Sequence, residues 1–441
     1  MNLGIPAKSV PAPLIAMLEH LETLDLAKTK FPAALTVDSL SCDTWQWLLA
    51  NPHLCRIVWS DRSTNEIEAG IGIAAELTLE PYTDASKFVA RCRAILNGNQ
   101  HLKFFGGFSF DGSDAWQNFG AGRFVIPRLS VDQRGVTINV MNAEDVKQAI
   151  ADLKDFSFQP QTNATEQASK TSVKFTPNFD GWQSRVDEAL SLIRNEVLEK
   201  IVLARKTDIQ FSKPLEAVEL TTRLKAATND CFVFCFNFQP ESAFVGATPE
   251  CLFSRQADLL ESEVIAGTRM RGSNPAEDER LAIELLTSDK DQREHDIVRK
   301  SIRQKLHMYV DHLDVASQAA ILRLAHKQHL HSAVSGRLKP GIDDGMLLNR
   351  LHPTPAVGGY PTDNALREIA RIEPFNRGWY AAPVGWIGAD SIQFTVAIRS
   401  GLIESDRLSL YSGAGIVRGS EPTQEWQEIE NKIQDFISVL H

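Results

Sequence analysis

Four acidic residues of the sequence fall in two closely spaced pairs that could bind a metal ion. Asp291 and Glu294 are three residues apart in SDKDQREHD, and Glu425 and Glu428 are three residues apart in QEWQEIEN. At this spacing, the two side chains of a pair share a helix face. Two such faces brought together would supply the hard oxygen ligands that suit Mg²⁺, which binds through one or two carboxylates together with water and substrate oxygens. Acidic pairs on solvated helix faces are also common, so the pairs alone leave both interpretations open.

A lysine stands at the start of an apolar strand pattern in EKIVLARK. Ile201, Val202 and Leu203 follow it without a break, and strand alternation places Lys200 on the same face as Val202 and Ala204. One interpretation is an edge-strand lysine whose ammonium reaches solvent. The other is a desolvated lysine that can accept a proton. The strand by itself does not decide between them.

Polar residues mark three further segments. In VIAGTRMRG, Gly267 and Thr268 would expose backbone amides to a ligand. In KQHLHS, His329 and His331 share a strand face, but no third histidine or cysteine is in register for zinc, which favours two polar core or pocket histidines. Glu250 follows a proline at the edge of an apolar strand, and alone it would be a loop carboxylate.

The elements that must position these residues include both helix and strand patterns. Hairpin-like strands followed by helices predict an α+β fold with large, mostly antiparallel β-sheets flanked by helices. We expect residues 1–156 to form an N-terminal α/β region that packs onto the catalytic body, which spans 176–441. Between them, residues 157–175 are polar and turn-rich, and they predict an exposed linker.

The composition of the chain limits its class. Its net charge is −10 and no basic stripe is visible, which disfavours a nucleic-acid binder. No apolar stretch reaches the length of a membrane span, and Glu19 and Glu22 interrupt the pattern that a signal peptide would need. The cysteines form no C-x-x-C pair, which is typical of reduced thiols. We therefore expect a soluble, cytoplasmic protein that binds neither nucleic acid nor membrane.

Several segments of the chain follow one another in the order found in a known enzyme family. They are EKIVLARK, FVGATPECLF, IAGTRMRG, KDQREHDIV, LHPTPAVGGYP, GWYAAPVGW, AIRSG, YSGAGIV and EWQEIENK. With these motifs the chain resembles the chorismate-utilising enzymes, and within that family it is most similar to the isochorismate synthases of the menaquinone pathway. The likeness is dense from Asp180 onward and looser before it. It implies the fold of component I of anthranilate synthase and chorismate as the small-molecule substrate.

The resemblance implies a role for the candidate residues. Lys200 would be the general base that activates water, and Glu250 the general acid that protonates the departing hydroxyl. Desolvation would move the lysine toward its neutral form and the glutamate toward its protonated form, as these roles require. The positions that match the family's substrate pocket are Gly267, Thr268, His329, Ala356, Tyr380, Arg399 and Gly413.

The acidic pairs match the family's metal site. Glu294 and Glu428 would hold Mg²⁺, and Asp291 and Glu425 would act beside them through metal-bound water. Chorismate is a dianion, so Mg²⁺ would meet one carboxylate and the planar fork of Arg399 the other.

Two alanines separate the branches of the family. Aminodeoxychorismate synthases carry a lysine where Ala266 stands, and anthranilate synthases carry a threonine associated with ammonia where Ala356 stands. Ala266 argues against the aminodeoxychorismate synthases and Ala356 favours water as the nucleophile, so we expect no obligatory amidotransferase partner. Salicylate synthases, which go on to expel pyruvate, and siderophore-pathway isochorismate synthases remain alternatives. A catalytically silent chorismate-binding subunit is disfavoured because Lys200 and Glu250 are both present.

Overall fold

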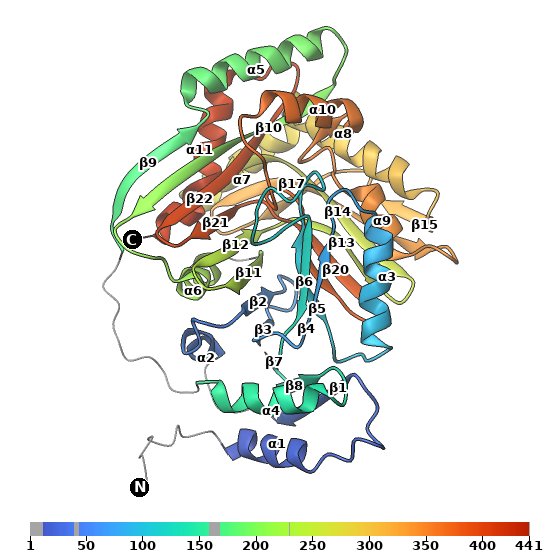
Figure 1. The fold of residues 1–441 in the computed structure, drawn as a ribbon. Helices are drawn as coiled ribbons and strands as arrows, with labels where there is room; N and C mark the ends of the chain where they lie inside the picture. Colours follow the sequence, from blue (N-terminus) through green and yellow to red (C-terminus); the bar gives the residue numbers. More distant parts are fainter. Residues whose placement is uncertain (1–11, 39–43, 158–167, 229, 441) are drawn as a thin grey trace.

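The structure is a computed structural model that describes residues 12–38, 44–157, 168–228 and 230–440. Two large antiparallel sheets run through its centre, with helices around them (Figure 1). This arrangement confirms the predicted α+β class. In the described ranges, no helix is long and apolar enough to span a bilayer.

Within the described residues, the first sheet has twelve strands. In spatial order they are β1 (Ala33–Asp38), β8 (Gly135–Val140), β7 (Leu129–Asp132), β3 (Ile67–Ile71), β2 (Arg56–Ser60), β11 (Phe232–Gln239), β12 (Ser242–Thr248), β21 (Ser400–Glu404), β22 (Arg407–Ile416), β10 (Lys200–Phe211) and β18 (Gly359–Tyr360), with β9 (Lys170–Thr176) also paired to β10.

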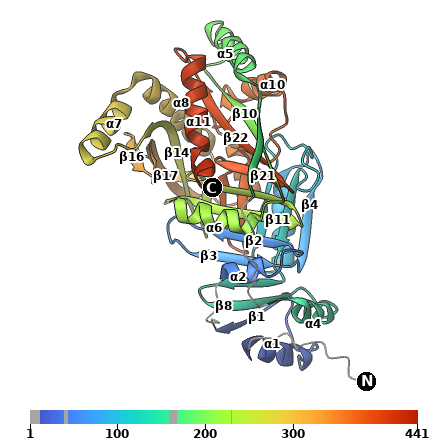
Figure 2. The same ribbon diagram turned by 90° about the vertical axis from the view of Figure 1, so that its left-hand side faces the viewer.

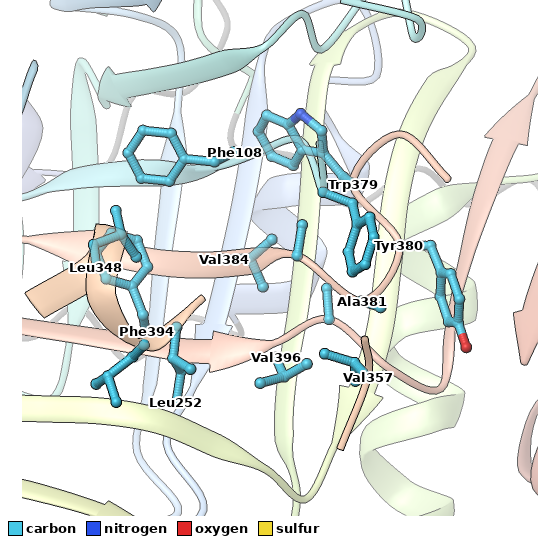
Figure 3. Close-up of a cluster of buried hydrophobic side chains, with 14 of the residues drawn as sticks. Phe108, Leu252, Leu348, Val357, Trp379, Tyr380, Ala381, Val384, Phe394 and Val396 are labelled. Atoms are coloured by element: carbon cyan, nitrogen blue, oxygen red, sulfur yellow. The ribbon is translucent and has the colours of Figure 1, made fainter. Parts of the chain in front are cut away.

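The second sheet has ten strands in the same described part of the chain. They are β15 (Val310–Val315), β17 (Lys327–Leu338), β14 (Leu259–Met270), β13 (Cys251–Gln256), β20 (Ser391–Val396), β19 (Pro383–Ile387), β5 (Phe104–Phe108), β6 (Gly122–Ile126) and β4 (Ala75–Leu79), with β16 (Ala320–Arg323) also paired to β17. Apolar residues of both sheets form one buried cluster, part of which is seen in Figure 3.

The N-terminal region contributes strands to both sheets. Strand β2 pairs with β11, placing Trp59 opposite Phe234, and β5 pairs with β19, placing Gly107 opposite Val384. A second apolar cluster packs against the first sheet, and near β1 and β8 it is covered by α1 (Ala12–Glu22) and α4 (Asp145–Asp155) (Figure 2).

Part of the segment predicted as a linker is a strand. Within 157–175, residues 158–167 lie outside the described residues, but residues from Lys170 onward form β9. This strand pairs along β10, with Thr207 opposite Phe175, while most of its side chains stay exposed. The segment therefore reads as polar in the sequence although its backbone is hydrogen-bonded, because an edge strand needs no buried side chains.

Helices flank the sheets. Besides α1 and α4 they are α2 (Thr44–Leu49), α3 (Ala85–Leu96), α5 (Phe179–Arg194), α6 (Ala217–Ala227), α7 (Pro275–Thr287), α8 (Asp289–Leu306), α9 (Asp344–Leu351), α10 (Thr362–Ile372) and α11 (Pro422–Ser438). Helix α8 is capped at its N-terminus by Ser288, whose side chain accepts a hydrogen bond from the Asp291 amide. Its acidic residues come early and its basic ones late, as the helix dipole favours. Helix α11 begins with a proline in its first turn.

Two of the connections by which the chain crosses between the two sheets contain a charged residue that matters for the site. Strand β12 of the first sheet is followed by β13 of the second, and Glu250 is in the short connection between them. Strand β20 of the second sheet is followed by β21 of the first, and Arg399 is in that connection. The amide of Val396 donates to the carbonyl of Glu250, so the two crossovers lie side by side.

Candidate active site

A cavity at these crossovers, called here the central cavity, collects most of the residues predicted from the sequence. Ten of the thirteen line it, namely Glu250, Gly267, Thr268, Glu294, His329, Ala356, Tyr380, Arg399, Gly413 and Glu428. Lys200, Asp291 and Glu425 are not part of the lining.

Lys200 is fully buried directly behind the cavity wall. It is the first residue of β10, and its Nζ lies 2.9 Å from Oε1 of Glu294, which does line the cavity. A Cβ atom on Gly415, in the neighbouring strand β22, would lie 2.3 Å from the same oxygen and 3.0 Å from Cε of the lysine. Any side chain at this position would collide with the ion pair, which explains sterically why YSGAGIV has a glycine at Gly415.

Glu250 faces the central cavity with almost none of its surface exposed to solvent. Burial raises the pKa of its carboxyl to about 8, and the charge of Glu263 acts in the same direction, while Lys200 and Lys432 oppose the shift. This upward shift of the pKa is the one expected from the sequence. Near neutral pH this carboxyl therefore carries a proton that it can donate.

Arg399 and His329 form one end of the cavity. Arg399 has a left-handed backbone conformation (φ 48°), and its Nη2 lies 2.6 Å from Nε2 of His329. Since a guanidinium only donates hydrogen bonds, Nε2 must accept and Nδ1 carries the ring hydrogen. Nδ1 is 3.1 Å from the carbonyl oxygen of Gly267, to which it can donate. Burial and the charge of Arg399 hold the pKa of His329 well below its usual range, so the ring is neutral and orients the arginine.

Gly267 and Thr268 lie at a bulge in β14. The register with β17 shifts between Ala266 and Thr268, and Gly267 has a φ of 75°, which glycine adopts without strain. The Thr268 hydroxyl lies 3.1 Å from Nδ1 of His329. The bulge turns this piece of backbone toward the cavity.

Tyr380 lies at the boundary between the apolar core and the cavity. Its ring stacks on Tyr411 with centroids 5.4 Å apart, and its hydroxyl points away from the buried cluster that contains Trp379 and Val384 (Figure 3). A Cβ atom on Gly413 would lie 3.1 Å from this hydroxyl, so the glycine leaves the space beside it open.

Two helices supply the carboxylates of the cavity. Glu294 is on α8 and Glu428 is on α11. Lys432, one turn after Glu428, pairs with it at 2.7 Å and donates to the Gly413 carbonyl at 3.0 Å. Burial acts to raise the pKa of Glu428, but Lys432, together with the charges of Lys290 and Lys200, outweighs burial and lowers it. Sequence reasoning assigned no role to Lys432, although its spacing of four from Glu428 puts both on one helix face.

The remaining acidic residues of the two pairs have other partners. Asp291 pairs with Arg269 at 2.8 Å, and Glu425, which is buried, pairs with Lys290 at 2.6 Å. Across the described ranges, no three or more His, Cys, Asp or Glu side chains are grouped so that they could hold a metal ion. The cavity itself thus offers two carboxylates.

Comparisons with known proteins agree with this geometry. A family model described as "Chorismate binding enzyme" matches residues 20–441. Isochorismate synthase MenF of Escherichia coli (strain K12) is 32% identical over 421 residues, covering 93% of this chain and 92% of that protein. Isochorismate synthase MenF of Bacillus subtilis (strain 168) is 34% identical over 349 residues, covering 76% and 74%.

Solved structures give the same result. The structure of the menaquinone-specific isochorismate synthase MenF from Escherichia coli matches with a TM-score of 0.84 and 29% identity, covering 97% of this chain and 99% of that one. Component I of anthranilate synthase from Streptococcus pneumoniae shares the fold, with a TM-score of 0.66 and 18% identity. The predicted resemblance is therefore confirmed, and the chain belongs to the family of chorismate-binding enzymes.

Proposed function

We propose that the protein is an isochorismate synthase, an isomerase that interconverts chorismate and isochorismate, and that it serves menaquinone biosynthesis. The observation that carries this proposal is the buried Glu250, which holds a donatable proton at the cavity that Lys200 adjoins and Arg399 closes. The MenF relatives, which match this chain over most of their length, support the same activity.

The proposed reaction exchanges one hydroxyl for another. Water attacks ring carbon C2 while Lys200 takes up one of its protons. The ring double bond shifts, the C4–oxygen bond breaks, and Glu250 donates its proton so that the departing group leaves as water. One water enters and one leaves; Lys200 ends with one proton more and Glu250 with one proton fewer, so that loss of a proton from Lys200 to solvent and uptake of one by Glu250 restore both. The same steps run backwards from isochorismate.

Arg399 binds one substrate carboxylate in this proposal. Its guanidinium can form two parallel hydrogen bonds to a carboxylate, and neutral His329 holds it from behind without repelling the anion. The Tyr380 hydroxyl and the space at Gly413 belong to the same end of the cavity. These contacts orient the ring but do not enter the chemistry.

The residues present fit a Mg²⁺ ion. Glu294 and Glu428 give two hard oxygen ligands from two helices, and Mg²⁺ characteristically takes one or two carboxylates and completes its shell with water and substrate oxygens. When bound, the ion would neutralise the second substrate carboxylate. Asp291 and Glu425, held by Arg269 and Lys290, would support these ligands from outside the cavity.

The nucleophile in this proposal is water, and no amidotransferase partner is required. Ala356 lines the cavity, and its methyl group offers no hydroxyl to an incoming ammonia molecule. The alternative activity is salicylate synthase, which would need isochorismate to remain bound until pyruvate is expelled. No residue of the cavity singles out that second step.

Product analysis tests the proposal. Purified protein is incubated with chorismate and Mg²⁺ near neutral pH, and the products are separated by chromatography. We expect a chorismate–isochorismate mixture that stops at equilibrium, with pyruvate at background when it is coupled to lactate dehydrogenase and NADH. Stoichiometric pyruvate together with fluorescent salicylate would overturn it in favour of salicylate synthase, and ammonia-dependent anthranilate would overturn the argument from Ala356.

A further inference from the structure

The orientation of the Glu250 carboxyl is set by its backbone and not by a hydrogen bond to its side chain. Within the described residues, no partner of its side-chain oxygens is found, whereas its backbone is fixed on both sides. Its carbonyl accepts from the Val396 amide at 3.0 Å, and its amide donates to the Thr248 hydroxyl at 3.3 Å. The direction of the carboxyl therefore depends on the turn from Pro249 to Cys251.

Two side chains from distant parts of the sequence hold this turn. Glu263, buried on β14, accepts a hydrogen bond from the amide of Cys251 at 2.6 Å. Arg62, in the loop after β2, donates to the carbonyl of Pro249 and binds Glu263 through both of its terminal nitrogens, at 3.0 and 2.7 Å. The residues on either side of Glu250 are thus fixed by one bidentate ion pair.

A histidine completes this group. Nε2 of His331 lies 2.9 Å from the Glu263 oxygen that also receives Arg62. Burial acts to raise the pKa of Glu263, but His331 and Arg62 outweigh it and lower the pKa, so this carboxylate stays ionised. A permanent negative charge close to Glu250 disfavours a second one there. The other charged groups that act on Glu250 are Lys200 and Lys432.

We propose that Glu263, held by Arg62 and His331, is the positioning residue that directs the Glu250 carboxyl into the central cavity. Its fixed negative charge beside that carboxyl favours the protonated form. This inference rests on the proposed role of Glu250 as general acid. It gives the N-terminal region a part in the reaction through Arg62, and it gives His331 a role other than metal binding.

The test uses Glu263→Gln, which keeps the oxygen that accepts from Cys251 but removes the charge. Substrate KM should stay within twofold, kcat should fall about tenfold, and the alkaline limb of the pH profile should move down by about one unit. Arg62→Gln, which removes the donor to Pro249, should lower kcat similarly, and Arg62→Lys should restore part of it. Asp344→Asn is the matched control, because Asp344 is an equally buried carboxylate paired with Arg93 and Arg255 away from the cavity.

A second measurement does not depend on turnover. The infrared carbonyl band of protonated Glu250, assigned by its loss in Glu250→Gln, is titrated in wild type and in Glu263→Gln. We expect its midpoint to move to lower pH in the variant and to stay in place in Asp344→Asn. An unmoved midpoint, or a kcat and pH profile equal to wild type, would overturn the positioning role. A wild-type protein that leaves chorismate unchanged while the band still shifts would refute the proposed function alone.

Discussion

The central cavity has two sides that differ in how far their charged side chains are buried. On the strand side, Lys200 and Glu250 are almost completely buried and are held by strand register and by the crossover between the sheets. On the helix side, Glu294 and Glu428 keep 15% and 34% of their side-chain surface exposed, and each has a lysine within 3 Å. The first side removes water from its ionisable groups, and the second leaves its carboxylates partly exposed beside lysines.

This difference separates two kinds of work. The proposed acid needs a carboxyl that is protonated near neutral pH, and burial at the crossover together with the charge of Glu263 provides it. Binding a cation needs carboxylates that remain charged and that can exchange one positive partner for another. The two sides meet at one contact, the ion pair between Lys200 and Glu294. Variants on either side should therefore fail in different ways.

The largest effect is expected for the strand side. Lys200→Ala removes the proposed base, so kcat for chorismate hydration should fall about 10²–10⁴-fold while substrate binding and folding persist. Lys206→Ala is the matched control: it lies six residues further along β10, and its ammonium pairs with Asp208 at 3.1 Å outside the cavity. Kinetics of both variants, with thermal denaturation, make the comparison. Activity of Lys200→Ala within threefold of wild type would return it to the role of an edge-strand lysine.

The helix side should fail through the metal. Glu428→Gln removes a charge and a hard oxygen ligand, so half-saturation by Mg²⁺ should need at least about tenfold more metal, with partial recovery at high concentration. EDTA should silence the wild type and added Mg²⁺ should restore it. Glu421→Gln, an exposed position at the start of the same helix, is the control. Full activity of metal-stripped wild type would leave both glutamates without a metal role.

The sequence located the strand side more accurately than the helix side, for a geometric reason. A strand residue has two possible directions, so alternation alone placed Lys200 on the face of Val202. Residues three apart on a helix differ by about 60° around its axis, so a shared face does not reveal which one reaches the cavity. Glu294 and Glu428 line it, whereas Asp291 and Glu425 turn to other partners.

Contacts between distant segments left no local signal. Glu263 and Arg62 are 201 residues apart, and neither stands in a pattern that points to the other. Only the pairing of β13 with β14 and of β2 with β11 brings them to the Glu250 turn. Lys432 differs from Glu263 and Arg62, because its spacing of four from Glu428 is a local pattern that predicts their contact. The family motifs indicated which residues gather, and the sheet topology was needed to show how they are held.

A pH profile should reveal the strand side without mutation. Glu250 must be protonated to act as an acid, and its pKa is raised to about 8, so kcat/KM should show an alkaline limb that falls tenfold per unit above that pH. An ordinary glutamate would instead lose its proton near pH 4. The rate of chorismate loss between pH 6 and 10 measures the limb, with thermal unfolding confirming that the fold persists. A limb below pH 6 would mean that Glu250 is not the acid.

The smallest effect is expected where the helix side is anchored from behind. Arg205, fully buried on β10, pairs with Glu430 of α11 at 2.5 Å and lies 4.2 Å from the ring of Trp426 on the same helix. Arg205→Met should cost about 3 kcal/mol of unfolding free energy, because it leaves Glu430 without its partner. Since α11 also carries Glu428, half-saturation by Mg²⁺ should rise only a few-fold, with kcat recovered at saturating metal. In denaturant titrations, the double variant Arg205→Met/Glu430→Gln should lose less unfolding free energy than the sum of the losses of the two single variants, since both substitutions remove the same ion pair. A kcat that stays low at saturating Mg²⁺ would show instead that this anchor acts on the buried acid and base, and that the two sides are not mechanically separate.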